Sequence, residues 1–284
     1  MAESKPGQNW ERSKLDDLLK GEKEPSKEID WINKGISLEA LGRPEEAIAC
    51  YERALELNPR FAEAWHSKGA ALGTLGRPQE AVACFNRALE LNPQYAQAWH
   101  NKGVALAASG RPTEALNCYE TALELNPRYA QAWINKGAAL AASGRPQEAM
   151  ACYDKALELN PRYADAWGHK GIALRALGRP EEAIECYDRS LRLNPRYAQA
   201  WYNKGLALGA LGKPEQEIDC YDRALELNPR YAQAWYNKGL ALGALGKPEQ
   251  EIDCLKKFVE LTPPQYASHV IQAEEIIRQL SQQI

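Results

Sequence analysis

Apolar residues recur along most of the chain at the spacing of amphipathic helices, in a pattern that repeats every 34 residues. Ile48, Tyr51 and Leu55 are one such group, and steps of three and four residues predict one face of a helix. Each unit holds two helical segments joined by Gly-Arg-Pro or Gly-Lys-Pro, a connector so short that the helices must run antiparallel. No window alternates with period two, so we predict no strands.

Pro and Gly residues mark where each helix is expected to begin and end. The first helix of a unit is expected to start at Asn-Pro, as at Asn58-Pro59, because Asn caps free amides and Pro tolerates the first helical position. It is expected to end at a Gly such as Gly212, which enters the left-handed conformation at least cost. Pro214-Glu215 should then open the second helix.

A fixed frame of residues surrounds seven Trp residues that lie 34 residues apart, from Trp31 to Trp235. Lys follows each Trp by three residues, Gly by four, Leu by seven, a second Gly by eleven, Pro by thirteen and Cys by nineteen. Seven units therefore occupy residues 28–61, 62–95, 96–129, 130–163, 164–197, 198–231 and 232–265. The chain is a one-dimensional repeat array rather than the two ordinary domains that 284 residues would suggest.

The frame resembles the repeat of the tetratricopeptide repeat family, a 34-residue helix–turn–helix. The matching residues of the second unit are Trp65, Gly69, Ala81, Phe85 and Pro93. The sequence departs from the family pattern where Lys replaces a Leu and Leu replaces a Tyr in every unit, and where Glu217 and Glu251 replace an Ala. The resemblance implies an all-α fold, a right-handed superhelical α-solenoid of seven helix–turn–helix hairpins with a C-terminal capping helix.

The two ends of the array differ from its units. Residues 266–284 predict the capping helix, with Val270, Ile271, Ile277 and Leu280 on its apolar side, because an array must cover its last apolar face. Residues 1–27 form a charged segment in which a short helix is expected over residues 10–20. This segment caps the first unit, frays or docks on a second molecule, and the sequence does not choose among the three.

Composition and charge exclude several kinds of partner. With 35 Lys and Arg against 38 Asp and Glu, the net charge is -3, so no basic surplus is available to bind nucleic acid. No stretch approaches the ~20 apolar residues of a membrane span. The first ten residues lack the apolar core of a secretory signal. We therefore expect a cytoplasmic protein that binds neither nucleic acid nor membrane.

No group of residues has the spacing of a catalytic or metal site. The seven Cys occupy equivalent places in successive units, too far apart for disulfides, so we expect buried free thiols. The four His residues are scattered without metal-ligand spacing, and no Gly-rich phosphate loop occurs. We expect neither an enzyme nor a cofactor or metal.

First-helix positions outside the frame are the candidates for function, because the resemblance implies that first helices line a concave groove. Two residues after Trp, five units carry Asn: Asn33, Asn101, Asn135, Asn203 and Asn237. Such a row of amides can pair with the backbone of an extended peptide, as asparagine ladders do in some members of the family. The alternative is that these Asn are solvated or bond to neighbouring helices.

Aromatic and apolar side chains complete the expected groove. Those one or five residues after Trp include His66, His100, Tyr202, Tyr236, Leu206 and Leu240. Tyr202 and Tyr236, above Gly209 and Gly243, are expected to receive a bulky side chain of a partner, and their alternative role is helix-to-helix packing. Arg175, eight residues after Trp167, is the only Lys or Arg in the rows one, five and eight residues after Trp, so the carboxylate clamp of co-chaperone members is not expected.

The Lys residues three after Trp are expected to bury their stems and keep the ammonium group at the edge. We expect Lys204 and Lys238 to pair with Glu217 and Glu251 of their own units, because a buried carboxylate without a partner is costly.

These features predict a protein–protein interaction scaffold that binds an extended peptide or a partner helix in the groove. The second hypothesis is self-assembly, in which the segment from Trp10 to Leu19 or the C-terminal helix of one copy occupies the groove or the open end of another copy. Residues 193–220 and 227–254 are identical, so the groove repeats its chemistry there, which suits an extended or repetitive ligand.

Overall fold

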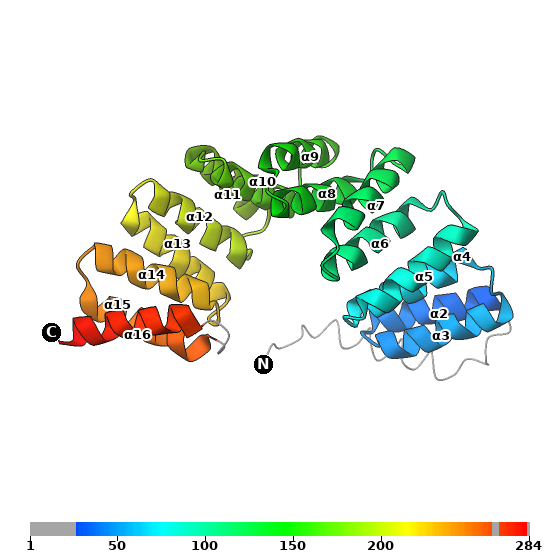
Figure 1. Cartoon of the computed structure of the whole chain (residues 1–284), viewed down its shortest axis with the longest axis horizontal. Coiled ribbons are helices and arrows are strands. Elements are labelled where there is room, and N and C mark those ends of the chain that lie inside the picture. The colour runs from blue at the N-terminus through cyan, green and yellow to red at the C-terminus, as the bar shows by residue number, and fades with distance from the viewer. Residues whose placement is uncertain (1–26, 263–266, 283–284) are drawn as a thin grey trace. The chain divides into compact units, whose positions relative to one another are not determined.

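The computed structural model describes residues 27–262 and 267–282, and within these residues it contains helices and no strand. The first helices of the hairpins are α2 (Glu28–Ala40), α4 (Ala62–Thr74), α6 (Ala96–Ala108), α8 (Ala130–Ala142), α10 (Ala164–Ala176), α12 (Ala198–Ala210) and α14 (Ala232–Ala244). The second helices are α3 (Pro44–Leu57), α5 (Pro78–Leu91), α7 (Pro112–Leu125), α9 (Pro146–Leu159), α11 (Pro180–Leu193), α13 (Pro214–Leu227) and α15 (Pro248–Leu261). A last helix, α16 (Ala267–Ser281), follows them (Figure 1). The predicted all-α fold is confirmed, whereas the short helix predicted over residues 10–20 lies outside the described residues.

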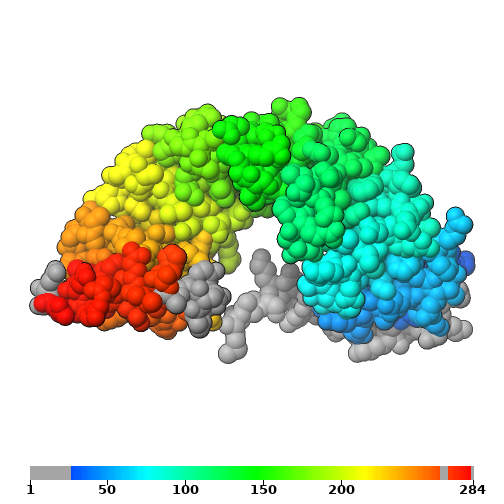
Figure 2. Space-filling model, in the orientation of Figure 1, coloured from blue at the N-terminus to red at the C-terminus, as the bar shows by residue number. Residues whose placement is uncertain are grey.

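The helices divide into two compact units, one ending at Ala139 and one beginning at Leu140. In the first unit, α2 to α7 form a continuous stack in which each helix contacts the next. In the second unit, α9 to α15 do the same, and α16 packs on α15. Figure 2 shows the yellow and orange hairpins of the second unit side by side, with the red last helix against the orange one. Each unit is thus an α-solenoid.

Each hairpin is held together by a Gly on its first helix and a large side chain on its second. A Cβ atom at Gly103 would lie 2.6 Å from the ring of Tyr119, so only Gly lets the helices approach this closely. Tyr51, Phe85 and Tyr187 occupy the equivalent place in other hairpins and are at most 2% exposed. Burying such a ring contributes about 2 kcal/mol, and the sequence repeats that contact along the stack.

The connector inside each hairpin follows the predicted chemistry. Gly212 has a φ of 66°, a left-handed backbone that disfavours every residue with a Cβ. Pro214 then occupies the first position of α13, as predicted. Its missing N–H costs nothing there, because the first amides of a helix have no intrahelical partner.

The predicted start of the first helices at Asn-Pro is wrong. Asn58 is the C-cap of α3, its side-chain Oδ1 accepts a hydrogen bond from the Arg60 N–H, and α4 begins only at Ala62. The indole Nε1 of Trp65 donates to the Pro59 carbonyl at 3.0 Å. Asn-Pro therefore builds the turn between hairpins, and the Trp side chain fastens this turn to the next helix.

The seven Lys residues that follow Trp lie beside it, but two of them form ion pairs other than the predicted ones. Their ammonium groups lie over the Trp three residues earlier, at 5.0 Å for Lys102 and 5.6 Å for Lys204. The predicted pairing of Lys204 with Glu217, and of Lys238 with Glu251, is wrong. The observed pairs are Lys204–Asp188 at 2.7 Å and Lys238–Asp222 at 2.5 Å. Both acids belong to the second helix of the preceding hairpin, so each Lys links consecutive hairpins.

The seven Cys residues are buried and free, as predicted. Burial raises the pKa of the Cys186 thiol to about 11, which keeps it protonated at neutral pH.

Helix α16 covers α15 with a face that differs from the predicted one. Val270, Ile276 and Ile277 pack around buried Ala273 and against Phe258. Ile271, predicted on the packed side, is 64% exposed. The contact follows steps of three and four from Val270 through Ala273 to Ile277, and this spacing turns Ile271 outward.

Candidate functional site

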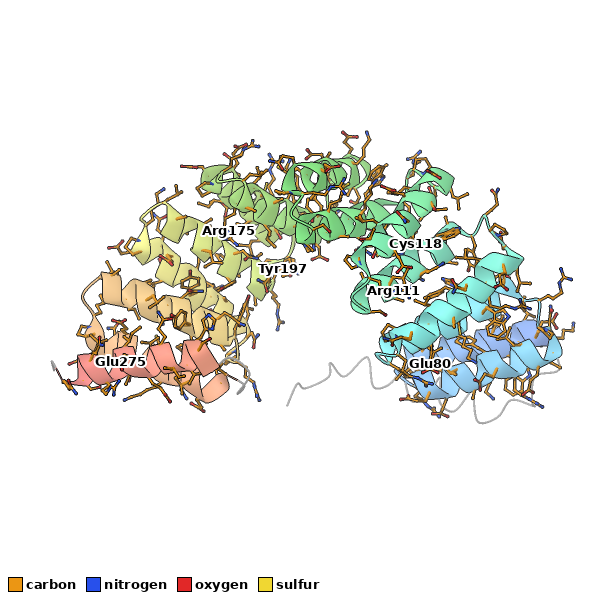
Figure 3. All side chains as sticks on the ribbon, viewed as in Figure 1. Glu80, Arg111, Cys118, Arg175, Tyr197 and Glu275 are labelled. Atoms are coloured by element: carbon orange, nitrogen blue, oxygen red, sulfur yellow. The ribbon has the colours of Figure 1, made fainter. Side chains whose placement is uncertain are left out.

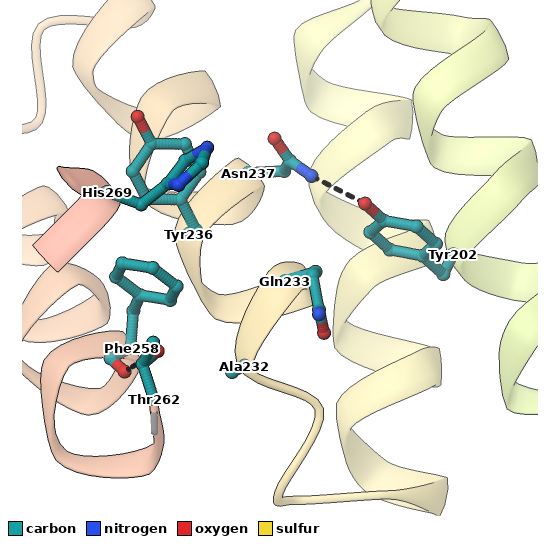
Figure 4. Close-up of a pocket in the computed structure, with 8 residues that line it drawn as sticks. All are labelled: Tyr202, Ala232, Gln233, Tyr236, Asn237, Phe258, Thr262 and His269. Carbon is teal, nitrogen blue, oxygen red and sulfur yellow. Dashed lines mark hydrogen bonds between the residues drawn. The ribbon is translucent and has the colours of Figure 1, made fainter. Parts of the chain in front are cut away.

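A pocket of about 310 Å³ opens in the second unit among α12, α14, α15 and α16. The residues that line it are Tyr202, Ala232, Gln233, Tyr236, Asn237, Phe258, Thr262 and His269 (Figure 4). Most of the wall is aromatic or aliphatic, and none of the lining residues is Asp, Glu, Lys or Arg. A concave, mainly apolar surface with a few amides and hydroxyls suits an uncharged group of a ligand.

Aromatic contacts hold the rings of the pocket in place. The ring centroid of Tyr236 lies 4.8 Å from that of Phe258 and 6.5 Å, edge-on, from that of His269. The ring centroid of Tyr202 lies 4.8 Å from that of Tyr231. Tyr202 and Tyr236 are both half-buried. They therefore pack between helices, which is the alternative role considered for them, and they also line the pocket.

Asn237 connects the two first helices of the pocket. Its side-chain Nδ2 donates to the hydroxyl of Tyr202 at 2.9 Å (Figure 4). Burial raises the pKa of Tyr202, so the phenol stays protonated and able to accept this hydrogen bond. The Asn237 amide thus fixes the position of the Tyr202 ring.

The first unit uses the same arrangement with His in place of Tyr. Asn101 Nδ2 lies 2.9 Å from His66 Nε2, and Asn135 Nδ2 lies 2.8 Å from His100 Nε2. Burial lowers the pKa of His66 to about 4, so its ring is neutral at pH 7 and Nε2 can accept from the amide. The other ring nitrogen, Nδ1, lies 3.2 Å from the hydroxyl of Tyr95 and carries the proton in this arrangement.

The five candidate Asn residues are therefore not equivalent. Asn101, Asn135 and Asn237 each bond to the preceding first helix, which is the alternative considered for them. Asn203 is only 5% exposed, and Asn33 is exposed. Of the other candidates, His100 is buried, His66 and Leu206 are half-buried, and Leu240 is exposed. The structure brings Tyr202, Tyr236 and Asn237 together at one pocket.

Gly209 and Gly243 do not leave open space for a bulky side chain, which corrects the expected position of the anchor. A Cβ atom at Gly209 would lie 2.7 Å from the carboxylate of Glu217, and one at Gly243 would overlap the carboxylate of Glu251. Each glycine instead makes room for a carboxylate from the second helix. The open volume lies two turns earlier along α14, beside Tyr236.

Phe258, Thr262 and His269 line the pocket but were not candidates from the sequence. Phe258 lies on α15, Thr262 is the C-cap of that helix, and His269 lies on α16. From the sequence, Pro263-Pro264 predicts the end of the preceding helix but does not predict which side of α14 the next helix covers.

The residues that the structure describes contain no group of three His, Cys, Asp or Glu side chains that could hold a metal ion. None of their helices combines the length and the apolar character needed to cross a bilayer.

The stacked hairpins define a helical-repeat protein, an α-solenoid. The chain belongs to the tetratricopeptide repeat family, whose models match residues 32–96, 66–116, 100–164, 164–197, 198–231 and 220–253. Proteins of this family are interaction scaffolds and are generally non-catalytic. The comparison with curated proteins finds no significant match.

Solved structures agree on the fold. The Cut9–Hcn1 hetero-tetramer of the APC/C contains a chain with a TM-score of 0.74 at 19% identity, over 87% of this chain and 48% of that one. This protein therefore spans about half the length of that relative. A tetratricopeptide repeat protein of Parabacteroides merdae has a TM-score of 0.68 at 18% identity, over 89% and 98% of the two chains. YrrB has a TM-score of 0.54 at 24% identity, over 66% and 97%. These identities show the common fold alone.

Proposed function

We propose that this protein binds an extended segment of a partner protein along the first helices of its second unit, with one bulky apolar side chain in the pocket beside Tyr236. The observation that carries the proposal is the pocket itself, whose walls are the rings of Tyr202, Tyr236 and Phe258 and whose rim offers the amides of Gln233 and Asn237. Amides can pair with a peptide backbone of any sequence.

The size of the pocket sets how much it can contribute. An aromatic side chain that buries ~200 Å² of surface gains about 5 kcal/mol before other costs. Ordering the peptide and losing its free motion offset much of this gain. One anchor therefore gives weak binding, and backbone contacts along further hairpins are needed for a stable complex.

Two of the similar structures support a protein ligand. YrrB is described as a protein with an unusual peptide-binding site. Cut9 is part of a hetero-tetramer with Hcn1. Both are proteins with the fold of this chain that contact a peptide or another protein, which supports the proposal.

Selection from a library of random dodecapeptides displayed on phage tests the proposal. We expect peptides with a Phe, Trp or Leu to be enriched, and we expect Tyr236→Ala to weaken their binding at least tenfold. Leu193→Ala is the matched control, because Leu193 is an exposed apolar residue (39%) that does not line the pocket. Peptides that bind the wild type and Tyr236→Ala equally well would show that the pocket is not the binding site.

Self-assembly is the competing hypothesis, and the exposed Ile271 on α16 favours it. Sedimentation equilibrium of the wild type and of Ile271→Asp separates the two. A dimer that Ile271→Asp dissociates supports self-assembly through α16, whereas a monomer in both cases rejects it.

A further inference from the structure

Glu251 is a buried carboxylate that lacks a hydrogen-bond partner among the residues that the structure describes. It is 8% exposed, and its carboxylate lies against the backbone of Gly243 on α14. The equivalent residue in the first five hairpins is a fully buried Ala: Ala47, Ala81, Ala115, Ala149 and Ala183. A methyl group is therefore sufficient for packing at this position, and the fold of a hairpin does not need a carboxylate there.

The other carboxylates at this level of a hairpin have a phenol to bond with. Tyr221 donates to Glu217 at 2.9 Å, and Tyr51 donates to Glu39 at 2.8 Å. In the last hairpin Leu255 stands where Tyr221 stands in the hairpin before, so Glu251 has no phenol within its own hairpin. Burial raises the pKa of Glu251, because the charged carboxylate is less well solvated there than in water.

Glu251 reaches the same side of α14 as the pocket. Tyr236, Leu240 and Gly243 follow one another in steps of four and three residues, so they share one face of the helix. Leu240 is 38% exposed between the other two. The seven residues from Tyr236 to Gly243 span about 10 Å along the helix axis. The face therefore runs from an apolar pocket to an unpaired carboxylate.

The charge of the residue eight positions after Trp differs from hairpin to hairpin. Arg175, on α10, occupies the position that Gly243 occupies on α14 (Figure 3). Lys247 and Lys256, the nearest cations to Glu251 in sequence, form no ion pair with it among the described residues, and Lys238 on α14 is paired with Asp222 and lies over Trp235. A cationic group is thus repelled at α10 and attracted at α14.

On the basis of the proposed function, we propose that the partner segment carries a Lys or Arg three residues from its apolar anchor and that this cation binds Glu251. Three residues of an extended chain cover about 10 Å, the distance between Tyr236 and Gly243 along the helix. The incoming cation supplies the partner that the buried carboxylate lacks, in the form of a charge-assisted hydrogen bond. The site therefore selects an apolar residue, two spacer residues and a basic residue.

Three blocked synthetic peptides serve as probes: one containing Phe-Ser-Ser-Arg, one with citrulline in place of Arg, and one with Ala in place of Phe. Citrulline keeps the shape of Arg without its charge. Binding to the full chain is followed by chemical-shift changes in amide NMR spectra, which report weak affinities. We expect the Arg peptide to bind about tenfold more tightly than the citrulline peptide at low salt, and this advantage should fall as salt is added.

Two variants test whether Glu251 is responsible. Glu251→Gln should abolish the preference for Arg, and Glu251→Ala should do the same while restoring the residue found in the first five hairpins. Glu217→Gln is the matched control, because the Glu217 carboxylate already accepts from Tyr221. It should keep the preference for Arg. Circular dichroism melting curves confirm that each variant is folded.

The outcomes separate this inference from the proposed function. Equal binding of the Arg and citrulline peptides, with loss of binding only for the Ala peptide, overturns the role of Glu251 and leaves the pocket standing. A preference for Arg that survives in Glu251→Gln and Glu251→Ala also overturns it. Absence of binding for all three peptides overturns both the inference and the pocket on which it rests.

Discussion

Replacement of Tyr221 by Phe removes the hydroxyl that donates to Glu217 and leaves a half-buried carboxylate without that donor. The ring of Tyr221 is fully buried, and the hydrogen bond is 2.9 Å long. A hydrogen bond to a charged group contributes about 1.5–3 kcal/mol. Because Glu217 keeps part of its surface in water, we expect Tyr221→Phe to cost about 1–2 kcal/mol at pH 7.

The reverse single change leaves a different defect. Glu217→Ala takes away the acceptor of a buried phenol, which costs about 1–3 kcal/mol and is partly offset because no carboxylate is then buried. The double variant recreates a combination that the second hairpin already uses: Gly73, Ala81 and Phe85. We expect its free energy of unfolding to lie within about 0.5 kcal/mol of the wild type, so the coupling between the two sites should be close to the sum of the two single costs, about 2–4 kcal/mol.

Hydrogen exchange of α13, followed by mass spectrometry, is the suitable assay, because a repeat array need not unfold in two states. Each single variant should exchange its α13 amides about 5–30 times faster than the wild type, and the double variant should not. Burial raises the pKa of Glu217, so the cost of Tyr221→Phe should be full above this raised pKa and shrink as the pH falls below it. A double variant as unstable as the sum of the two single variants would refute the reasoning.

Four further predictions concern residues elsewhere in the chain. Gly103→Ala should destabilise by about 1–3 kcal/mol, since the new methyl meets the Tyr119 ring. Gly73→Ala should stabilise by about 0.5–1 kcal/mol, since nothing lies within 4 Å of its Cβ; melting temperatures in the opposite order would contradict both. The pKa of His66, lowered to about 4, means that its contribution to stability is full above its unfolded pKa near 6.5 and is lost as the pH falls through about 4; an NMR titration that places the ring pKa above 6 would disprove this. The buried thiols, including Cys186 with its pKa of about 11, should react with Ellman's reagent at pH 8 only after denaturation.

Local chemistry explains which parts of the fold could be predicted. Pro214 and Gly212 determine the conformation of their own backbone, so the start of α13 and the preceding turn can be predicted from the sequence. Asn58-Pro59 suits a helix start and a turn equally well, and only the course of the backbone decides between them. The partner of Lys204 depends on how one hairpin sits against the one before it, which residues within a single unit do not encode.

The residues of the candidate site also divide into those that the repeated sequence predicts and those that depend on how helices pack. Tyr202, Tyr236 and Asn237 follow from their position after Trp, because every unit repeats the same helix. Phe258 and His269 join them only because α16 folds over α15, and this contact occurs once in the array. Periodicity can identify residues that recur, but it carries no information about a contact made only at the end.

The hydrogen bond from each indole to a proline carbonyl six residues earlier has a consequence for how such a chain evolves. Trp65 with Pro59 and Trp235 with Pro229 show that this bond is completed within one short stretch of sequence. A gene rearrangement that inserts or deletes 34 residues therefore carries the complete indole–proline bond along with the new hairpin. Bonds between hairpins, such as those of Lys238 with Asp222 and of Asn237 with Tyr202, must instead be formed again with the new neighbour.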